Sequence, residues 1–195
     1  DNTVTSGSGD DTIDSGSGND TISAGDGTNV IDAGDGDNTV TAGSGADTID
    51  SGSGNDTISA GDGDNVVDAG AGNDTVTTGA GDDIIIGGAG DDIISAGNGD
   101  NVIDAGAGND TIYAVSGNDA IDAGDGDDTI YAGGGNNSFT GGEGTDHVDY
   151  SGSAEPITVD LSGGTVTSDA CNDTFTGIEA FTGSDYDDTF SFNDP

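Results

Sequence analysis

The side chains best suited to chemistry in this sequence are aspartates and asparagines that recur every nine residues. Aligned on the segment Gly87 to Ser95, the chain shows sixteen consecutive nonapeptides from Ser6 to Asp149, without an insertion. Carboxylate and amide oxygens are ligands that hard cations such as Ca²⁺ prefer. The candidate ligands are the residues at position six of each nonapeptide: Asp11, Asp20, Asn29, Asn38, Asp47, Asp56, Asn65, Asp74, Asp83, Asp92, Asn101, Asp110, Asp119, Asp128, Asn137 and Asp146.

The composition indicates that the chain needs such cations in order to fold. Lys and Arg are absent, Asp and Glu number 40, the formal net charge is -40, and hydrophobic residues make up only 29%. Such a chain repels itself and has little apolar surface to bury, so oxygen-binding cations must supply the missing stabilisation. The charge also excludes nucleic-acid binding, which needs Lys and Arg against phosphate. No apolar run approaches the ~18 residues of a membrane-spanning helix, so no membrane insertion is expected.

The glycines and apolar residues of the repeat predict the elements that hold these ligands. Position four is Gly in all sixteen repeats and position two in fifteen, Val115 being the exception. Glycine adopts backbone conformations that side chains forbid, so these positions predict a tight loop whose carbonyl groups turn toward one point. Position eight is always Ile, Val or Phe, which predicts a very short strand with one inward residue. Such a strand is stable when like strands stack above and below it at ~4.8 Å.

The pattern, written out in Gly87-Gly88-Ala89-Gly90-Asp91-Asp92-Ile93-Ile94-Ser95, resembles the calcium-binding nonapeptide repeat of the RTX, or hemolysin-type, family. The resemblance implies an all-β fold, a right-handed parallel β-roll, which is a β-solenoid with two nonapeptides per coil. Odd and even repeats would then form opposite sheets and opposite columns of loops. The sequence departs from the family pattern at position one, which is mostly Ala or Ser, and at the five Asn residues of position six.

The resemblance also implies calcium ions between loops one coil apart, held by loop carbonyls and the position-six side chains. Two columns of eight loops leave seven gaps each, which allows up to about 14 ions. The odd column alternates strictly between Asp and Asn from Asp11 to Asn137, whereas the even column carries Asp everywhere except at Asn38. Each odd-column site would see one carboxylate and one amide, and most even-column sites two carboxylates, which predicts tighter binding in the even column. The alternative is that Asn replaces Asp isosterically, without functional difference.

After Asp149 the period breaks, so we predict a β-roll over residues 1–149 and a C-terminal β cap over 150–195. Six of the nine aromatic residues, Phe192 among them, lie in this second segment. The alternating run from Ile157 to Leu161 predicts a half-buried strand. Phe175 and Phe190 each follow an Asp-Thr pair and are expected to point inward like the apolar residues of the repeats. The single cysteine, Cys171, cannot form an internal disulfide and is expected to be inert, the alternative being a disulfide with another molecule.

No catalytic or cofactor-binding constellation is recognised, and the chain is not expected to be an enzyme. His147 is the only histidine and occupies an outward strand position, so His-dependent sites lack their partners. The pairs Thr21/Ser23, Thr39/Thr41, Thr57/Ser59 and Thr75/Thr77 face outward in register, which resembles the ice-binding face of some antifreeze proteins. The alternative is that Thr is present because it favours strands.

These observations predict a calcium-binding structural module of a secreted or cell-surface bacterial protein, such as an adhesin stalk, an S-layer component or a filament subunit. The alternatives are a calcium-triggered folding and secretion domain of an RTX toxin or secreted enzyme, and an ice-binding protein. The resemblance implies type I secretion. The expected partners are calcium ions, and end-to-end self-association is a further hypothesis because the segment from Thr3 to Thr5 offers an unpaired strand edge. The alternative is that further repeats precede this segment and cover the edge.

Overall fold

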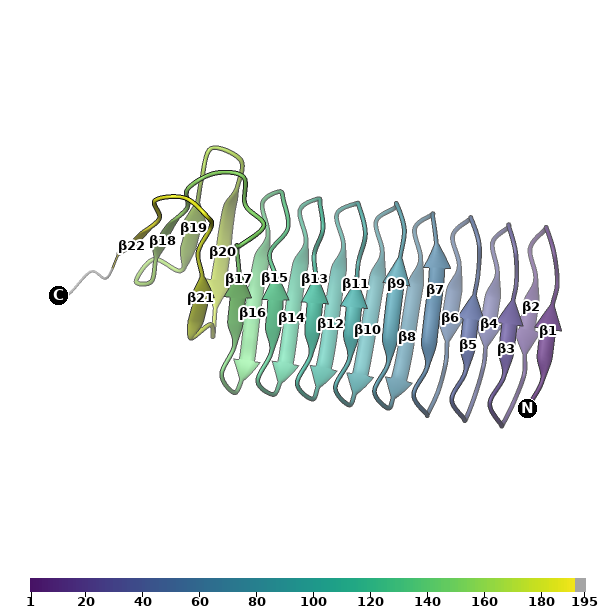
Figure 1. Ribbon diagram of the computed structural model, residues 1–195. Helices are drawn as coiled ribbons and strands as arrows, with labels where there is room; N and C mark the ends of the chain where they lie inside the picture. The colour runs from purple at the N-terminus through teal and green to yellow at the C-terminus, as the bar shows by residue number, and fades with distance from the viewer. Residues whose placement is uncertain (192–195) are drawn as a thin grey trace.

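The computed structural model describes residues 1–191 and folds them into a rod of stacked coils with two sheets on opposite sides (Figure 1). The chain is all-β over these residues, and none of them forms a helix long and apolar enough to cross a membrane. The N-terminus lies at one end of the rod, and the segment after Asp149 covers the other end. Phe192, counted above with the aromatic residues of the cap, lies outside the described residues.

One sheet is formed by the even repeats and the other by the odd repeats, as predicted. The 10-stranded sheet runs, in order, β1 (Thr3–Thr5), β3 (Thr21–Ser23), β5 (Thr39–Thr41), β7 (Thr57–Gly61), β9 (Thr75–Thr78), β11 (Ile93–Ser95), β13 (Thr111–Tyr113), β15 (Thr129–Tyr131), β17 (His147–Asp149) and β21 (Ala180–Thr182). The 12-stranded sheet runs β2 (Thr12–Asp14), β4 (Val30–Asp32), β6 (Thr48–Asp50), β8 (Val66–Ala71), β10 (Ile84–Ala89), β12 (Val102–Ala107), β14 (Ala120–Asp125), β16 (Ser138–Glu143), β20 (Asn172–Thr176), β19 (Thr165–Thr167), β18 (Thr158–Asp160) and β22 (Thr189–Ser191).

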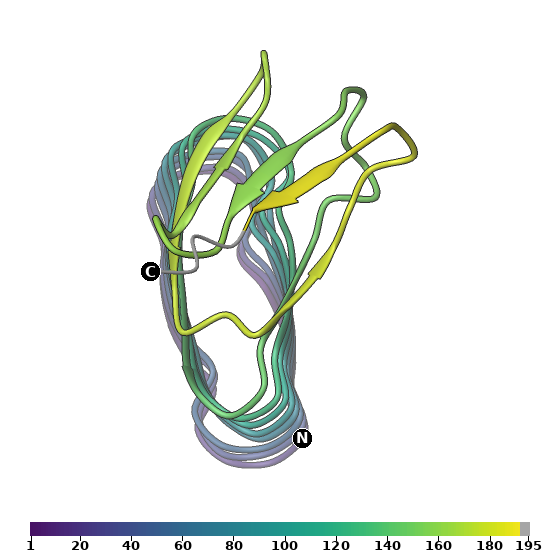
Figure 2. The ribbon, with the colours of Figure 1, turned by 90° about the vertical axis from the view of Figure 1, so that its left-hand side faces the viewer.

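The strands of the repeats are parallel and pair in a register of one coil, which is two nonapeptides. Ile85 of β10, for example, lies beside Val67 of β8 and Ile103 of β12. Seen along the rod, the coils superimpose as a flattened ring whose long walls are the sheets and whose narrow ends are the loops (Figure 2). The prediction of a parallel β-roll with two nonapeptides per coil is confirmed.

The core is thin because each repeat contributes one large inward side chain. Ile85 and Ile94, from opposite sheets, are fully buried, and the small residues at position one, such as Ala96 and Ala105, fill the space beside them. One buried Ile or Val contributes roughly 1.5–3 kcal/mol. A core of this kind cannot by itself offset the repulsion of a chain with a net charge of -40.

The loop glycines are required by the close approach of successive coils. At position two, Gly70 has a φ of +94°, and a Cβ added there would lie 1.9 Å from the carbonyl oxygen of Gly52, one coil earlier. Val115, at the same position of its own repeat, has a φ of 60° and is the one non-glycine residue with positive φ among residues 1–191. A β-branched residue in this region is strained.

The segment after Asp149 first leaves the roll and then returns to it. β20 and β21 pair with β16 and β17 and so extend the sheets by a further coil. β18 and β19 form an antiparallel hairpin, and β22 lies parallel to β18 (Figure 2). β18 confirms the strand predicted near Ile157. Phe175 is buried as expected, but Phe190 is 43% exposed, so its predicted inward orientation is wrong. Its strand, β22, ends the sheet order, and no further coil within residues 1–191 encloses it.

Candidate metal sites

The structure gathers all sixteen predicted ligands into two columns, one along each narrow side of the rod. Each ligand sits directly before a strand, where the loop turns into the sheet. Apart from half-buried Asp11, all of them are buried, with at most 3% of the residue exposed. Asp173, which precedes the inward Phe175, continues the odd column as a seventeenth, equally buried member. The columns are therefore lines of buried polar groups between coils.

From Asp20 onward, one oxygen of each position-six side chain accepts a hydrogen bond from the backbone of the preceding coil. The Oδ1 atom of Asp110, for instance, accepts a hydrogen bond of 2.7 Å from the backbone N–H of Asp92. The same bond joins successive members throughout both columns, at 2.6–3.1 Å. Glu179 takes this role at the end of the even column, where its Oε2 accepts from the N–H of Asp146 at 2.9 Å.

The second oxygen of every position-six aspartate is buried and has no hydrogen-bond partner. This holds for Oδ2 of eleven residues: Asp11, Asp20, Asp47, Asp56, Asp74, Asp83, Asp92, Asp110, Asp119, Asp128 and Asp146. A buried carboxylate oxygen without a partner costs about 1–3 kcal/mol or more. Eleven of them in register are a repeated feature of the fold, and they call for a ligand that is not part of the polypeptide.

The surroundings of these oxygens fit a hard cation. A Cβ added to Gly87 would lie 2.7 Å from Oδ2 of Asp92 and 2.5 Å from the carbonyl oxygen of Ala105, one coil further on. At Gly141 the corresponding neighbours are Oδ2 of Asp146 and the carbonyl oxygen of Gly177. Carboxylate and carbonyl oxygens are thus the nearest polar atoms at Gly87 and Gly141. An all-oxygen environment of this kind suits Ca²⁺.

Backbone carbonyls are essential to such a site. Residues 1–191 contain no group of three or more His, Cys, Asp or Glu side chains placed to hold a metal ion. A cation in a column would therefore be bound by a position-six carboxylate together with loop carbonyls of two successive coils. The glycines at positions two and four make this arrangement accessible, because at most of these positions a Cβ would collide with the backbone one coil earlier.

The electrostatics of the columns are those of anions held away from water. Burial raises the pKa of nine position-six carboxyls: Asp47, Asp56, Asp74, Asp83, Asp92, Asp110, Asp119, Asp128 and Asp146. The pKa of Asp92 rises to about 7, first through burial and then through repulsion from Asp74 and Asp110 in the adjacent coils. A bound cation would reverse this effect, because it stabilises the charged form.

The five position-six asparagines differ from the aspartates at the second terminal atom of the side chain, which is a nitrogen in Asn and Oδ2 in Asp. The amide nitrogen of Asn38 donates to the carbonyl oxygens of Gly34 at 3.0 Å and Gly36 at 2.8 Å, both in its own loop. It also lies 3.3 Å from the carbonyl oxygen of Ser51, in the next coil. The asparagine side chain therefore donates hydrogen bonds to the loop carbonyls. In an aspartate repeat the same carbonyls face the unpaired Oδ2.

A second ladder of hydrogen bonds, which was not predicted from the sequence pattern, is formed by the side chains at position five. The Oδ1 atom of Asp91 accepts from the backbone N–H of Asn109 one coil later, at 2.8 Å, so this ladder runs opposite to that of position six. Similar exposed bonds join Asp37 to Asn55 and Asp64 to Asp82. Asp or Asn fills position five in thirteen of the sixteen repeats, a regularity that could have revealed it. These exposed side chains link the coils but bury no charge.

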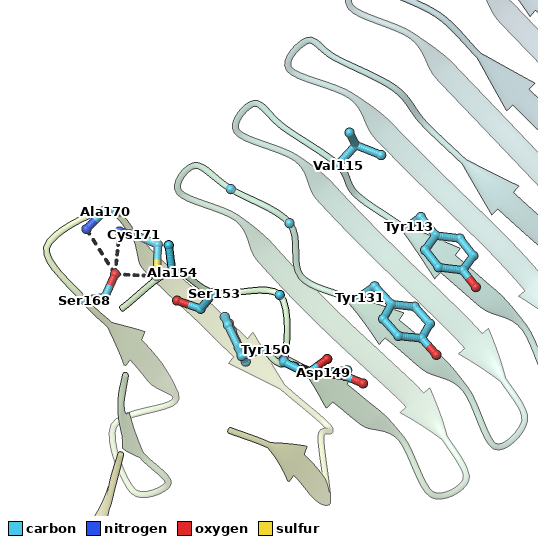
Figure 3. A pocket seen from close by; sticks show the side chains of 14 residues that line it. Tyr113, Val115, Tyr131, Asp149, Tyr150, Ser153, Ala154, Ser168, Ala170 and Cys171 are labelled. Atoms are coloured by element: carbon cyan, nitrogen blue, oxygen red, sulfur yellow. Dashed lines mark hydrogen bonds between the residues drawn. The ribbon is translucent and has the colours of Figure 1, made fainter. Parts of the chain in front are cut away.

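A separate cavity of about 460 Å³ lies between the last coils and the start of the cap (Figure 3). Tyr113 and Tyr131 line it from neighbouring strands, with their rings stacked 4.5 Å apart. Asp149 is the only carboxylate in its lining, and no histidine contributes. Burial raises the pKa of the Cys171 thiol, whose sulfur accepts a bond of 3.4 Å from the Ser168 hydroxyl (Figure 3). A raised pKa favours the thiol over the thiolate, and the inertness of Cys171 stays a prediction.

Comparisons with known proteins agree with the repeat pattern. The family model described as RTX calcium-binding nonapeptide repeat (4 copies) matches eight overlapping stretches: residues 1–31, 23–58, 41–76, 51–85, 59–94, 77–112, 86–121 and 113–148. Together these stretches cover the chain from its first residue to the last complete nonapeptide. Searches of curated proteins and of solved structures found no match.

Proposed function

Because the chain belongs to the family of RTX calcium-binding nonapeptide repeat proteins, we propose that it is a calcium-rigidified structural module of a secreted or cell-surface bacterial protein. An adhesin stalk, an S-layer component or an extracellular filament subunit would use such a module. The observation that carries the proposal is the set of eleven buried, unpaired carboxylate oxygens. They lie in two columns along the rod and do not gather in one pocket. Ligands distributed in this way stabilise a shape and do not form a single reaction site.

Calcium would act by neutralising charge that the fold itself places out of water. The chain's own residues supply Oδ1 contacts that set the coil spacing and Oδ2 atoms that face the loop carbonyls. An ion bound to Oδ2 and to these loop carbonyls would join successive loops. It would bind the folded rod in preference to the unfolded chain. By linkage, calcium then stabilises the rod. Outside the cell millimolar calcium is available, which fits the secreted location typical of this family.

Circular dichroism in chelator and in calcium tests this role. In EDTA at neutral pH we expect a largely unordered chain, and millimolar calcium should restore the β-sheet signal. Magnesium, which is smaller and gives up its water reluctantly, should restore much less and serves as the control. A chain equally ordered in EDTA and in calcium would contradict the proposal.

The alternative roles differ from this one in the surface they need. The threonine ladder is present on the 10-stranded sheet, where Thr21, Thr39, Thr57 and Thr75 lie in register. Ile93 interrupts the first ladder column, and Tyr113 and Tyr131 interrupt the second, which leaves a short flat face for ice. Absence of thermal hysteresis in the calcium-loaded protein would exclude ice binding. A folding and secretion domain would instead be recognised by an enzyme or toxin domain encoded beside it.

The filament form of the proposal depends on the exposed edge of β1. Within residues 1–191 this strand pairs only with β3, so its other edge can pair with a second chain or with a preceding coil of the same chain. Head-to-tail contact between different ends does not close on itself and builds a fibre. Electron microscopy with saturating calcium tests this: fibres lost on chelation, and not formed by Val4→Asp, would support it. Monodisperse particles at high protein concentration would contradict it.

A further inference from the structure

The position-six asparagines of this chain are held in one orientation by the backbone. An amide side chain can present either its oxygen or its nitrogen, so the sequence leaves its role open. In all five cases the oxygen accepts from the N–H of the preceding coil, at 2.8–3.1 Å, from Asp11, Asp20, Asp47, Asp83 and Asp119. Turning the amide around would place its NH₂ group against this N–H, two donors facing each other. The nitrogen must therefore point to the other side.

On that other side lie the carbonyl oxygens that a cation would need. The nitrogen of Asn29 donates to Gly25 at 3.1 Å and to Gly27 at 3.3 Å, and it lies 3.5 Å from the carbonyl oxygen of Ala42. Asn65 donates to Gly61 and Gly63 at 3.1 and 2.8 Å. The carbonyls come from positions two and four of the same loop and from position one of the next coil. The amide nitrogen thus occupies the place that a cation beside Oδ2 would occupy in an aspartate repeat.

The charge and the hydrogen bonding of the two repeat types differ accordingly. In an aspartate repeat the second oxygen has no donor and its group carries a negative charge. In an asparagine repeat the amide nitrogen, a neutral donor, lies at the place of Oδ2. None of the five amide nitrogens is buried without a hydrogen-bond partner. A cation entering there would meet an N–H group instead of an oxygen, and the amide would have to abandon its carbonyl partners to admit it.

We propose that the five asparagine repeats bind no calcium, because the amide nitrogen takes the place of the ion, so that the chain holds eleven ions and not fourteen or more. The inference rests on the proposed calcium-binding role. It assigns four ions to the odd column, in every second coil, at Asp11, Asp47, Asp83 and Asp119. It assigns seven to the even column, six of them in consecutive coils from Asp56 to Asp146. Asn29, Asn38, Asn65, Asn101 and Asn137 form metal-free links between coils.

Native mass spectrometry of the full chain, equilibrated with calcium and separated from free ions, counts the bound ions directly. We expect eleven for the natural sequence, twelve for Asn65→Asp and ten for Asp83→Asn. The matched control is Asp64→Asn, which removes a charge from the adjacent exposed position and should leave the count at eleven. Because exposed carboxylates retain some calcium loosely, the changes between variants decide the assignment.

The possible failures can be told apart. Fourteen or more ions, with a count unchanged in Asn65→Asp and in Asp83→Asn, would overturn the assignment of the asparagines and leave calcium binding intact. A chain that retains no calcium at all would overturn the proposed function and this inference with it. If Asn65→Asp fails to give a β-sheet signal in calcium, the loss of one ion in Asp83→Asn, measured against Asp64→Asn, still decides the question.

Discussion

The two loop columns are built from the same backbone but carry different charge. In the even column, carboxylates occupy six consecutive coils from Asp56 to Asp146, and each is buried beside the next. In the odd column a neutral amide separates every two carboxylates. Burial is the main cause that raises the pKa of both Asp92 and Asp83. Repulsion from carboxylates of adjacent coils raises the pKa of Asp92 further, whereas hydrogen bonds from Asn65, the neighbour of Asp83 in the odd column, lower the pKa of Asp83.

This difference shows that the two loop columns of one solenoid can depend on bound cations to different degrees. The even column has almost no internal way to balance its charge, so its stability depends on cations or protons. The odd column is partly closed by side chains alone. We therefore expect loss of calcium to loosen the even column first, and the predictions below set one column against the other.

The largest expected effect is that of pH in the absence of calcium. Burial raises the pKa of Asp92 to about 7 and those of Asp74 and Asp128 to about 6, against roughly 3.9 in an unfolded chain. The folded chain then binds more protons than the unfolded chain between pH 4 and 7, so its stability rises as the pH falls through this window. In EDTA we expect the β-sheet signal to increase from pH 7.5 to pH 5, by an effect on the order of a few kcal/mol.

Two matched triple variants locate this pH effect. Replacing Asp74, Asp92 and Asp128 by Asn should abolish most of it, whereas replacing Asp47, Asp83 and Asp119 of the odd column should leave most of it in place. Both variants remove three buried charges, so only the column differs. Equal loss of the pH dependence in the two variants would show that repulsion between adjacent coils is unimportant. In saturating calcium the trend should reverse, because protons displace the ion.

A smaller effect, of opposite sign in two conditions, is expected for Asp92→Asn. In EDTA at neutral pH the amide should satisfy the carbonyls now facing an unpaired oxygen, which stabilises the rod by about 1–3 kcal/mol. In calcium at 100 times the dissociation constant, loss of one ion should destabilise it by roughly 2.7 kcal/mol. Chemical denaturation in the two conditions measures both, with an osmolyte added in EDTA. Asp91→Asn, which removes a neighbouring exposed charge, is the control; the same sign in both conditions for Asp92→Asn would refute the idea.

The sequence predicts the fold unusually well and the site only in part, for reasons that particular residues show. Ile85 lies in the core and Gly70 in a crowded loop, and each has a single kind of surroundings. Residue type alone therefore predicts where each of them lies in the fold. Asn38 has two different ends, and which end meets the loop carbonyls is decided by an N–H eighteen residues earlier in the chain. Phe190 follows the repeat pattern locally but lies in a strand that no other coil of the described residues encloses, which no local pattern can reveal.

The end of the odd column offers a third test. Here the Tyr150 hydroxyl donates to Oδ2 of Asp173 at 2.7 Å, so a neutral donor again fills the second position, as an asparagine amide does. Tyr150→Phe should leave this oxygen unpaired and lower the free energy of unfolding by about 1–3 kcal/mol in calcium. Tyr186→Phe, at a side chain that is 53% exposed, is the control and should have little effect. Equal melting temperatures for the two variants would mean that the hydroxyl bond adds nothing.

The smallest expected effect concerns Val115, which distorts the odd column beside it. Where position two is Gly in both neighbouring coils, the amide of Asn65 reaches the carbonyls of positions two and four of its loop. In the coils on either side of Val115 this pattern is lost. Asn101 donates to Gly99 and to Asp119, and Asn137 donates to Ala132. The strained valine thus coincides with the two asparagine loops that lack the position-two bond.

Val115→Gly should relieve the strain of a φ of 60° and stabilise the calcium-loaded rod by about 1 kcal/mol, since the strain exceeds the entropy that glycine adds to the unfolded chain. Val102→Gly is the matched control: it removes a valine of similar exposure from a strand, where glycine is unfavourable, and should destabilise by a similar amount. Thermal denaturation in calcium compares the two. A loss of stability in both variants would mean that the loop has adapted to Val115, and that the altered bonds of Asn101 and Asn137 have another cause.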